Sequence, residues 1–506
     1  MKKEYNFTPA DTMIVIGLLI LGLLFWEFRV LDTSHSAIGI FLFFIYAVVI
    51  TLIYFAKKGI KQNGKSIFAL CVVIAGALPF LLYDPTDIFF VLLCFELLAC
   101  LLWVMFSCKN QVENKLSGYL LIDSVNQTTL TPLCNFDGIF RSLFSRKSER
   151  RGGKTFLFAL VGIIIALPIL WIVINLLSSA DDGFARIADR ILEIISLRHL
   201  LTYFLELIIG IPIAAYVFGS IYGNAHERFS QVLTKESSTT VFEKLHVIPR
   251  PALYAPLIVL NLIYIIFFVA MGAYLFSGFA GDLPAEYTYS TYARKGFFEL
   301  CAVASINLVI LAIVYIFGKR NGKEYPTWMR LLTCLFSALT VLLILTAVSK
   351  MLLYIGSYGL TQLRVYVMFF LIFILVVFLV LIIWHIRPFN AGKPIVLAAV
   401  ILVLTLFLSN HQGLIAKYNI ENYMSGNLKE LDIEVFVNMS DAVIPPLIDL
   451  RDSLQENDPL KIKIQDMIDS HVWEDISFDF WNDDIEVSFS SWNIQSYLVD
   501  RITPLE

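Results

Sequence analysis

The sequence predicts an all-α polytopic membrane helical bundle of about 11 spans, followed by a small C-terminal α+β extracytoplasmic domain. Of its 506 residues, 58% are hydrophobic and only 16% are charged, whereas soluble domains carry about 25% charged residues. The charges are also unevenly placed, because residues 411–506 hold 19 acidic and 6 basic side chains although the whole chain carries a net charge of −4. A basic membrane part therefore precedes an acidic tail.

Eleven segments are long and apolar enough to cross a bilayer, which takes roughly 17–25 predominantly apolar residues. The first follows a charged start, as in a signal peptide, but it has no small-x-small cleavage site, so we expect it to remain as a span. The predicted spans are 12–28, 37–56, 66–83, 87–107, 155–178, 199–223, 252–277, 296–318, 327–349, 362–386 and 394–410.

The connections between these spans alternate in charge. Those on the N-terminal side of the membrane hold 23 Lys and Arg residues, and those on the opposite side hold 8. Basic residues mark the cytoplasmic side, so the N-terminus is predicted to be cytoplasmic and, after eleven crossings, the C-terminus extracytoplasmic. Residues 180–198, in one of the longer outer connections, have the apolar spacing of a helix that lies on the membrane surface.

The chain divides into four regions: four N-terminal spans in 1–107, a basic cytoplasmic insert in 108–154, a seven-span core in 155–410, and the acidic tail in 411–506. The insert ends in "RSLFSRKSERRGGK", which is expected to hold the orientation and contact anionic lipid, with partner binding as the alternative. In the tail, residues 428–454 suit short helices broken at Pro445-Pro446. Residues 476–489 alternate in polarity around "WNDD", which predicts a hairpin.

Motifs for catalysis or cofactor binding are weak. Residues 59–66, "GIKQNGKS", match the phosphate-binding loop pattern, but two spans flank them and leave no room for a nucleotide-binding fold. We interpret Ser66 as a cap of the next span, and Ala215, Gly219 and Gly223 as a packing stripe within the chain. The seven histidines and seven cysteines are dispersed without metal-ligand spacing. We therefore expect no cofactor, no metal and no nucleic-acid partner.

Five polar residues stand out inside predicted spans, and one of them, Arg330, is one turn into its span. Glu96 is halfway along its span, Glu206 is about a third of the way in, and Asn261 and Asn307 are near the middles of theirs. A charge at the bilayer centre costs at least about 2.5–3.5 kcal/mol, so we expect these groups to face the bundle interior. Two interpretations remain open: hydrogen bonding between helices with a protonated Glu96, or a proton or ion path.

The stretch "YARKGFFEL", residues 292–300, places further polar groups at the start of a span. Tyr292, Lys295 and Glu299 share one helix face because they follow i, i+3, i+7 spacing. Arg294 and Lys295 are the only basic residues in this predicted outer loop. Glu299 lies only about 5 Å past the interface, at 1.5 Å per residue. These side chains predict a polar collar at an outer mouth.

The same stretch, followed by "INLVIL", resembles the core of bacterial membrane proteins grouped as domain of unknown function 4173, with its close relative 4153. In the tail, "YNIENYMSG", "LDIEVFVNMSDAVIPPLIDL" and "SSWNIQSYLVDR" are similar to that family's segments after the membrane part. The resemblance covers roughly residues 150–506 and implies the membrane architecture and a bacterial cell membrane, but no biochemical activity. It draws attention to Tyr292, Arg294, Gly296, Glu299 and Asn307.

The favoured hypothesis is a non-enzymatic protein that uses its spans for transport or permeation, or for envelope signal sensing with the tail as an outer sensing or docking domain. The lipid bilayer is its expected partner, and the sequence names neither a substrate nor a protein partner. One alternative is a membrane-embedded enzyme acting on a lipid-linked substrate, such as a glycosyltransferase, although the first outer loop, "LDTSHS", is short for such a site. Another is a scaffold for envelope proteins.

Overall fold

The computed structural model describes residues 4–28, 30–31, 37–83, 88–113, 119–144, 173, 176, 197–280, 297–319, 326–387, 389–437, 439–474 and 493–502. Within these residues the chain is helical, apart from turns and an isolated parallel bridge between Ile248 and Gly318. The predicted helical architecture is therefore confirmed where the chain is described. The predicted α+β character of the tail is not supported, since its described elements are all helical and the hairpin at 476–489 lies outside the described residues.

Nine helices in the described ranges are long and apolar enough to cross a membrane. A tenth crossing results if α17 (Gly392–Leu408) and α18 (His411–Met424), which are bent by 66° at their junction, are taken together. The predicted span 155–178 lies almost entirely outside the described residues, so the count of eleven is approximate. The nine helices are α1 (Pro9–Glu27), α2 (Ala37–Lys58), α3 (Gly64–Leu82), α4 (Phe89–Cys108), α10 (Leu197–Ala225), α12 (Arg250–Ala280), α14 (Phe297–Phe317), α15 (Thr327–Tyr358) and α16 (Gln362–Ile386).

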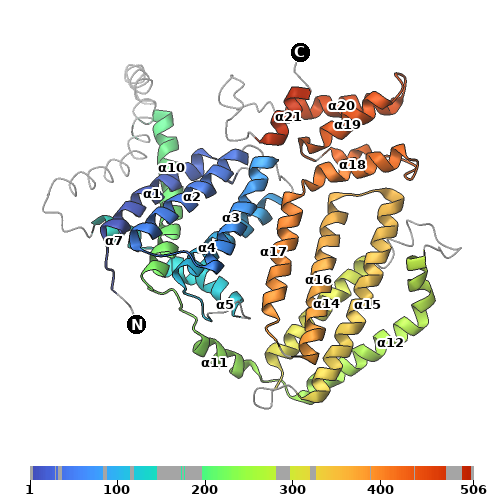
Figure 1. Ribbon diagram of the computed structural model, residues 1–506, viewed down its shortest axis with the longest axis horizontal. Coiled ribbons are helices and arrows are strands. Elements are labelled where there is room, and N and C mark those ends of the chain that lie inside the picture. Colours follow the sequence, from blue (N-terminus) through green and yellow to red (C-terminus); the bar gives the residue numbers. More distant parts are fainter. Residues whose placement is uncertain are drawn as a thin grey trace.

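These helices form two bundles, each with its own apolar core (Figure 1). The first bundle contains α1 to α4 and α10, and the second contains α12, α14, α15 and α16. Helix α17 lies between them, because it contacts both α3 and α16 and contributes the buried Phe407 to the first core. The tail adds a third, smaller core at one end of the helices.

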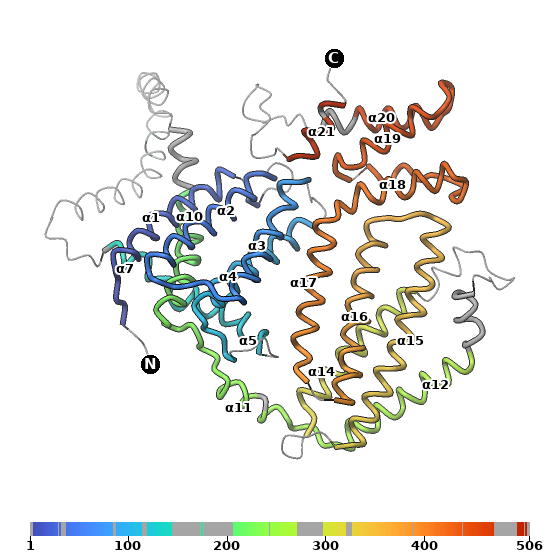
Figure 2. The backbone as a smooth tube through the Cα atoms, in the orientation of Figure 1, coloured from blue at the N-terminus to red at the C-terminus, as the bar shows by residue number. Residues whose placement is uncertain are grey.

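Helices α1 and α10 run antiparallel in close contact (Figure 2). The backbone N–H of Asn6 donates to the Tyr222 hydroxyl at 3.1 Å near one end, and Gly22 faces Gly210 toward the other. A Cβ atom added at Gly22 would lie 2.3 Å from the carbonyl oxygen of Gly210. The two backbones therefore approach more closely than larger side chains would allow, as is typical of helix contacts in lipid.

Part of the predicted insert folds as a cap of short helices at one end of the first bundle. Its asparagines hold the loop after α10, since the Nδ2 of Asn126 donates to the carbonyl of Leu233 at 2.9 Å and that of Asn135 to Arg228 at 2.9 Å. The predicted stripe packs here, within the chain, because Gly219 faces the backbone of Pro132. The cap consists of α5 (Leu120–Val125), the π-helix η2 (Asn126–Leu130), α6 (Thr131–Cys134) and α7 (Gly138–Phe144).

Helix ends correct two details of the sequence analysis. Asn63, not Ser66, is the N-cap of α3, and its Oδ1 accepts hydrogen bonds from the backbone N–H groups of Lys65 and Ser66 at 3.0 and 3.2 Å. In the tail, Pro445 and Pro446 begin a helix rather than break one. They lie in its first turn, where proline is tolerated because the N–H groups there have no helical partner.

The tail packs as a helical layer on the second bundle, at the end of the molecule opposite to the described N-terminal residues (Figure 1). Buried aliphatic and aromatic side chains such as Phe436, Leu447 and Ile464 form its core. Helix α18 lies next to the bundle and contacts α16. The elements that follow α18 are η3 (Ile433–Phe436), η4 (Asp441–Val443), α19 (Ile444–Ser453), α20 (Pro459–Glu474) and α21 (Ile494–Ile502).

Candidate functional site

The strongest candidate site is the joint where tail helix α18 meets the turn between α15 and α16. The side chain of Asn419 accepts a hydrogen bond from the backbone N–H of Leu360 at 2.6 Å and donates one to its carbonyl at 2.8 Å. Gly359 precedes this contact with a φ of 73°, and a Cβ atom added there would lie 2.5 Å from the Asn419 Oδ1. Glycine is required twice here, by the left-handed backbone and by the close approach of the amide.

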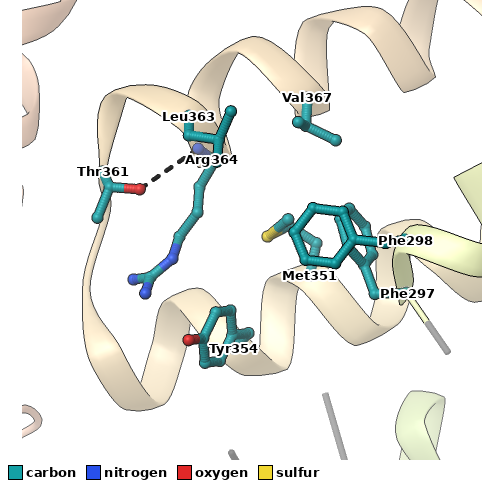
Figure 3. A pocket seen from close by; sticks show the side chains of 8 residues that line it. All are labelled: Phe297, Phe298, Met351, Tyr354, Thr361, Leu363, Arg364 and Val367. Carbon is teal, nitrogen blue, oxygen red and sulfur yellow. Dashed lines mark hydrogen bonds between the residues drawn. The ribbon is translucent and has the colours of Figure 1, made fainter. Parts of the chain in front are cut away.

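Beside this joint, α14, α15 and α16 line a partly open cavity of about 250 Å³ (Figure 3). Phe297 and Phe298 come from the first turn of α14, and Met351 and Tyr354 come from the last turns of α15. Arg364 and Val367 come from the start of α16. The cavity therefore has an apolar lining with one cationic side chain at the end nearest the tail.

Arg364 connects the cavity to the joint. Its Nη1 donates to the carbonyl of Tyr358 at 3.0 Å and also to the carbonyl of Gly359, while its guanidinium lies 4.2 Å from the centre of the Tyr354 ring. The turn between α15 and α16 is thus held from the membrane side by Arg364 and from the tail side by Asn419.

Only part of the predicted outer collar is described. Glu299 is exposed in the first turn of α14, at the same end of the bundle as the cavity, and it interacts electrostatically with the buried Lys350 of α15. Sequence reasoning did not single out Lys350, because the predicted span 327–349 ends just before it, whereas α15 continues to Tyr358. Tyr292, Arg294 and Lys295 lie outside the described residues.

Deeper in the second bundle, Asn307 joins three helices. Its Oδ1 accepts a hydrogen bond from the Tyr264 hydroxyl at 2.7 Å, and its Nδ2 donates to the Thr340 hydroxyl at 2.9 Å. Asn261 donates to the carbonyl of Leu332 at 3.2 Å. A second contact between helices joins the His385 side chain of α16 to the Tyr315 hydroxyl of α14. It lies nearer the end of the bundle that faces away from the tail. These contacts fit hydrogen bonding between helices, the first of the two interpretations of the buried polar residues.

The two acidic residues predicted with Asn261 and Asn307 lie in the other bundle. Glu96 is fully buried in α4 beside Gly76 of α3, and both of its carboxyl oxygens are without a hydrogen-bond partner within the described part of the chain. Glu206 lies about a third of the way along α10, and it interacts electrostatically with Glu27. Of the five predicted site residues in the described part of the chain, Glu96 and Glu206 lie in the first bundle, and Asn261, Glu299 and Asn307 lie in the second.

A comparison with protein families finds a match over most of the chain. Residues 69–450 match the family model described as Domain of unknown function (DUF4153). The chain belongs to the DUF4153 family. The match extends further toward the N-terminus than the resemblance seen in the sequence, and it is to DUF4153 rather than to the related 4173 family. Neither the comparison with curated proteins nor that with solved structures gives a significant match.

The DUF4153 region contains the joint, the cavity and the polar groups of the second bundle, but not the helices α1 and α2. The family description carries no activity, so the arrangement of these residues is the basis for assigning one. Within the described residues, no group of three or more His, Cys, Asp or Glu side chains is placed to hold a metal ion.

The structure also shows an ionic cluster that sequence reasoning missed. Most of its residues precede the part of the chain that matches DUF4153. The Asp11 carboxylate at the start of α1 is fully buried and accepts hydrogen bonds from Lys58 at 3.0 Å and from Tyr54 at 2.6 Å. His226, beyond the end of α10, approaches the same carboxylate at 3.0 Å. The only sequence signal was the spacing of Thr8 and Asp11, which form a capping box. Because these residues are far apart in the sequence, their meeting required the fold.

Two further groups in the cap have shifted acidities. Burial alone would raise the pKa of Asp137, but hydrogen bonds from Tyr5 and Arg141 outweigh it and hold this pKa below its usual value. Burial raises the pKa of Asp123 to about 6, although a hydrogen bond from the backbone N–H of Val112 at 2.9 Å opposes the shift. The cap of this DUF4153 protein therefore contains an ordered network of polar contacts, in addition to the basic residues noted in the sequence.

Proposed function

We propose that this protein is a receptor-like membrane protein. Its tail senses a signal at the cell exterior and transmits it to the bundle of α14, α15 and α16. The proposal takes the tail as extracytoplasmic, as the distribution of basic residues predicts. It develops the sensing half of the hypothesis drawn from the sequence.

The bond pair between Asn419 and Leu360 is the observation that carries this proposal. A tail that served only as a soluble appendage would need no bidentate contact with a turn between two membrane helices. Here the contact holds both polar groups of one backbone unit, and Arg364 holds the same turn from the other side. Such an element gives a physical route by which the tail and the bundle bias one another.

The polar groups of the second bundle favour this role over transport. Asn307, Tyr264 and Thr340 satisfy one another. Thr340 and Lys350 are ten residues apart on α15, about 15 Å at 1.5 Å per residue. The buried residues between them are the apolar Leu343, Ile344 and Ala347 and the polar Thr346 and Ser349. The Thr346 hydroxyl donates to the carbonyl of Leu342 within its own helix at 2.9 Å, which is a local contact rather than one between helices. The enzyme and scaffold alternatives gain no specific contact from the described residues.

The test is complementation of cells from which the gene has been deleted, under an envelope stress that the deletion strain does not survive. Asn419→Leu, produced at wild-type levels in the membrane, is expected to lose complementation. Asn422→Ala, on the same helix, is the matched control and is expected to retain it, since Asn422 bonds only within the tail. Loss with Asn307→Leu but not with Asn419→Leu would favour the transport alternative instead.

A further inference from the structure

We propose that the cavity between α14, α15 and α16 binds one anionic phospholipid of the leaflet next to the tail, with an acyl chain among the apolar side chains and the phosphate on Arg364. This inference uses the membrane position of the bundle but not the receptor role. Lipid binding and signal transmission can therefore succeed or fail separately.

The lining of the cavity fits part of a hydrocarbon chain. Its volume of about 250 Å³ is just below the ~300–1,000 Å³ of pockets that enclose drug-sized ligands. Phe297, Phe298, Met351 and Val367 supply most of its wall. Aromatic rings and a methionine thioether can pack against a flexible apolar ligand. Few polar groups of the lining would lose water when such a ligand binds. A compact polar solute would find few partners among these side chains.

The lining of the cavity is polar at the end near the tail and apolar deeper in the bundle. A phospholipid has the same order, with a polar headgroup outside and acyl chains inside. Thr361, Arg364 and Tyr354 lie toward the ends of α15 and α16 that meet the tail. Met351 and Val367 each lie about one turn deeper in the bundle on their respective helices. In Figure 3 the Arg364 guanidinium and Tyr354 occupy one side of the cavity, and Met351 with the two phenylalanines occupies the other.

Arg364 has donors to spare for a phosphate. A guanidinium carries five N–H donors, and the hydrogen bonds of this one go to two backbone carbonyls through Nη1. In the described part of the chain, no carboxylate lies within ion-pair distance of it. Arginine recognises phosphate oxygens through a planar pair of N–H groups, and basic pockets between membrane helices are typical sites for anionic headgroups.

Nearby charge does not oppose this assignment. Glu299 is exposed on α14, one residue beyond the cavity wall, and would repel a phosphate if it acted alone. Its electrostatic interaction with Lys350 offsets that negative charge. Arg364 lies at the predicted outer end of α16, where the charge rule for membrane proteins disfavours basic residues. A headgroup contact explains why a cation is placed there.

Native mass spectrometry of the purified full chain tests the proposal, with phosphatidylglycerol and phosphatidylethanolamine of identical acyl chains offered in turn. The wild type is expected to retain one phosphatidylglycerol at least about tenfold more tightly than phosphatidylethanolamine, which corresponds to ~1.4 kcal/mol. Arg364→Gln should abolish this preference. Arg387→Gln, an exposed arginine at the other end of the same helix, should leave it unchanged.

A second variant and a soluble competitor complete the test. Val367→Phe fills the cavity and should reduce retention of both lipids while Arg364 stays in place. Equal retention of the two lipids by the wild type, or unchanged retention by both Arg364→Gln and Val367→Phe, would overturn the proposal. Displacement of the lipid by soluble glycerol phosphate would also overturn it, because a free phosphate would then be the ligand. Asn419→Leu should still retain the lipid, which separates this result from that of the complementation assay.

Discussion

Asn419 binds both backbone polar groups of Leu360, although the two residues are 59 positions apart. The contact joins the first helix of the tail to the turn between two membrane helices. Asn419 is buried, and Leu360 is partly buried where it packs against the apolar cores of the second bundle and of the tail, so water would not readily replace a lost hydrogen bond. This joint is the one place where the described tail holds a membrane-helix turn by paired hydrogen bonds.

Asn419→Leu is predicted to loosen the joint. Leucine offers neither a donor nor an acceptor, so the N–H and carbonyl of Leu360 lose their partners, at a cost of about 1–3 kcal/mol. Hydrogen exchange of peptides covering residues 356–364, measured in lipid nanodiscs, should become faster. Asn422→Ala should leave that exchange unchanged. Equal exchange in wild type and Asn419→Leu would show that the contact does not restrain the turn.

The crossing of α1 and α10 gives a prediction about packing. Gly22→Ala and Gly210→Ala should each destabilise the protein by about 1–3 kcal/mol, because the added methyl group meets the backbone of the facing helix and no side-chain rotation relieves it. Gly356→Ala in α15 is the control, since a Cβ atom there meets nothing within 4 Å. It should be neutral or stabilising by about 0.5–1 kcal/mol. The three variants are compared by thermal unfolding in one detergent. An equal change in stability for all three would contradict the close contact between α1 and α10.

Gly76 and Glu96 should be coupled energetically. A Cβ atom at Gly76 would lie 2.3 Å from the Glu96 Oε2, and the fully buried carboxyl has little space into which to move. Gly76→Ala is therefore predicted to destabilise the wild type more than it destabilises a Glu96→Ala background. A double-mutant cycle should give an interaction energy of about 0.5–3 kcal/mol. Strictly additive effects would mean that the two residues do not share this space.

The cap should show a pH dependence through Asp123. Its folded-state pKa is raised from 3.8 to about 6, so the folded state holds the proton more tightly than the unfolded state does. Stability should fall as the pH rises from about 4 to 6 and then stay level. Asp123→Asn keeps an oxygen for the Val112 N–H but has no charge. Thermal unfolding should find it more stable than wild type above pH 6, by on the order of 1 kcal/mol, and similar below pH 4. A constant difference at all pH values would contradict the burial of a charged Asp123.

Membrane helices were predictable because their signal is local. Runs of about 20 apolar residues identify a span without knowledge of its neighbours, and Asn307 was correctly expected to face the bundle interior. The N-terminal cap of α3 was less well predicted. Its cap is Asn63, because a side chain before the first helical turn satisfies the free N–H groups better than Ser66 within that turn.

The joint and the ionic cluster could not be predicted, because both depend on contacts between distant segments. Asn419 and Leu360 carry no motif, and Asp11 meets Lys58 and His226 only after α1, α2 and α10 have packed together. Glu96 lies in the first bundle and Asn261 and Asn307 lie in the second, which the sequence could not show. Depth along a span shows how far a residue lies in the membrane, but it does not show which bundle the helix joins.

The account depends most on the tail facing the cell exterior, and cysteine labelling measures this directly. Glu456→Cys places a thiol at an exposed tail position with 96% of its side chain accessible, and Lys61→Cys places one in the exposed connection between α2 and α3. With a membrane-impermeant maleimide, and the unsubstituted chain as the background, Glu456→Cys should be labelled in intact cells and Lys61→Cys only after permeabilisation. Labelling of Lys61→Cys but not Glu456→Cys in intact cells would contradict the account.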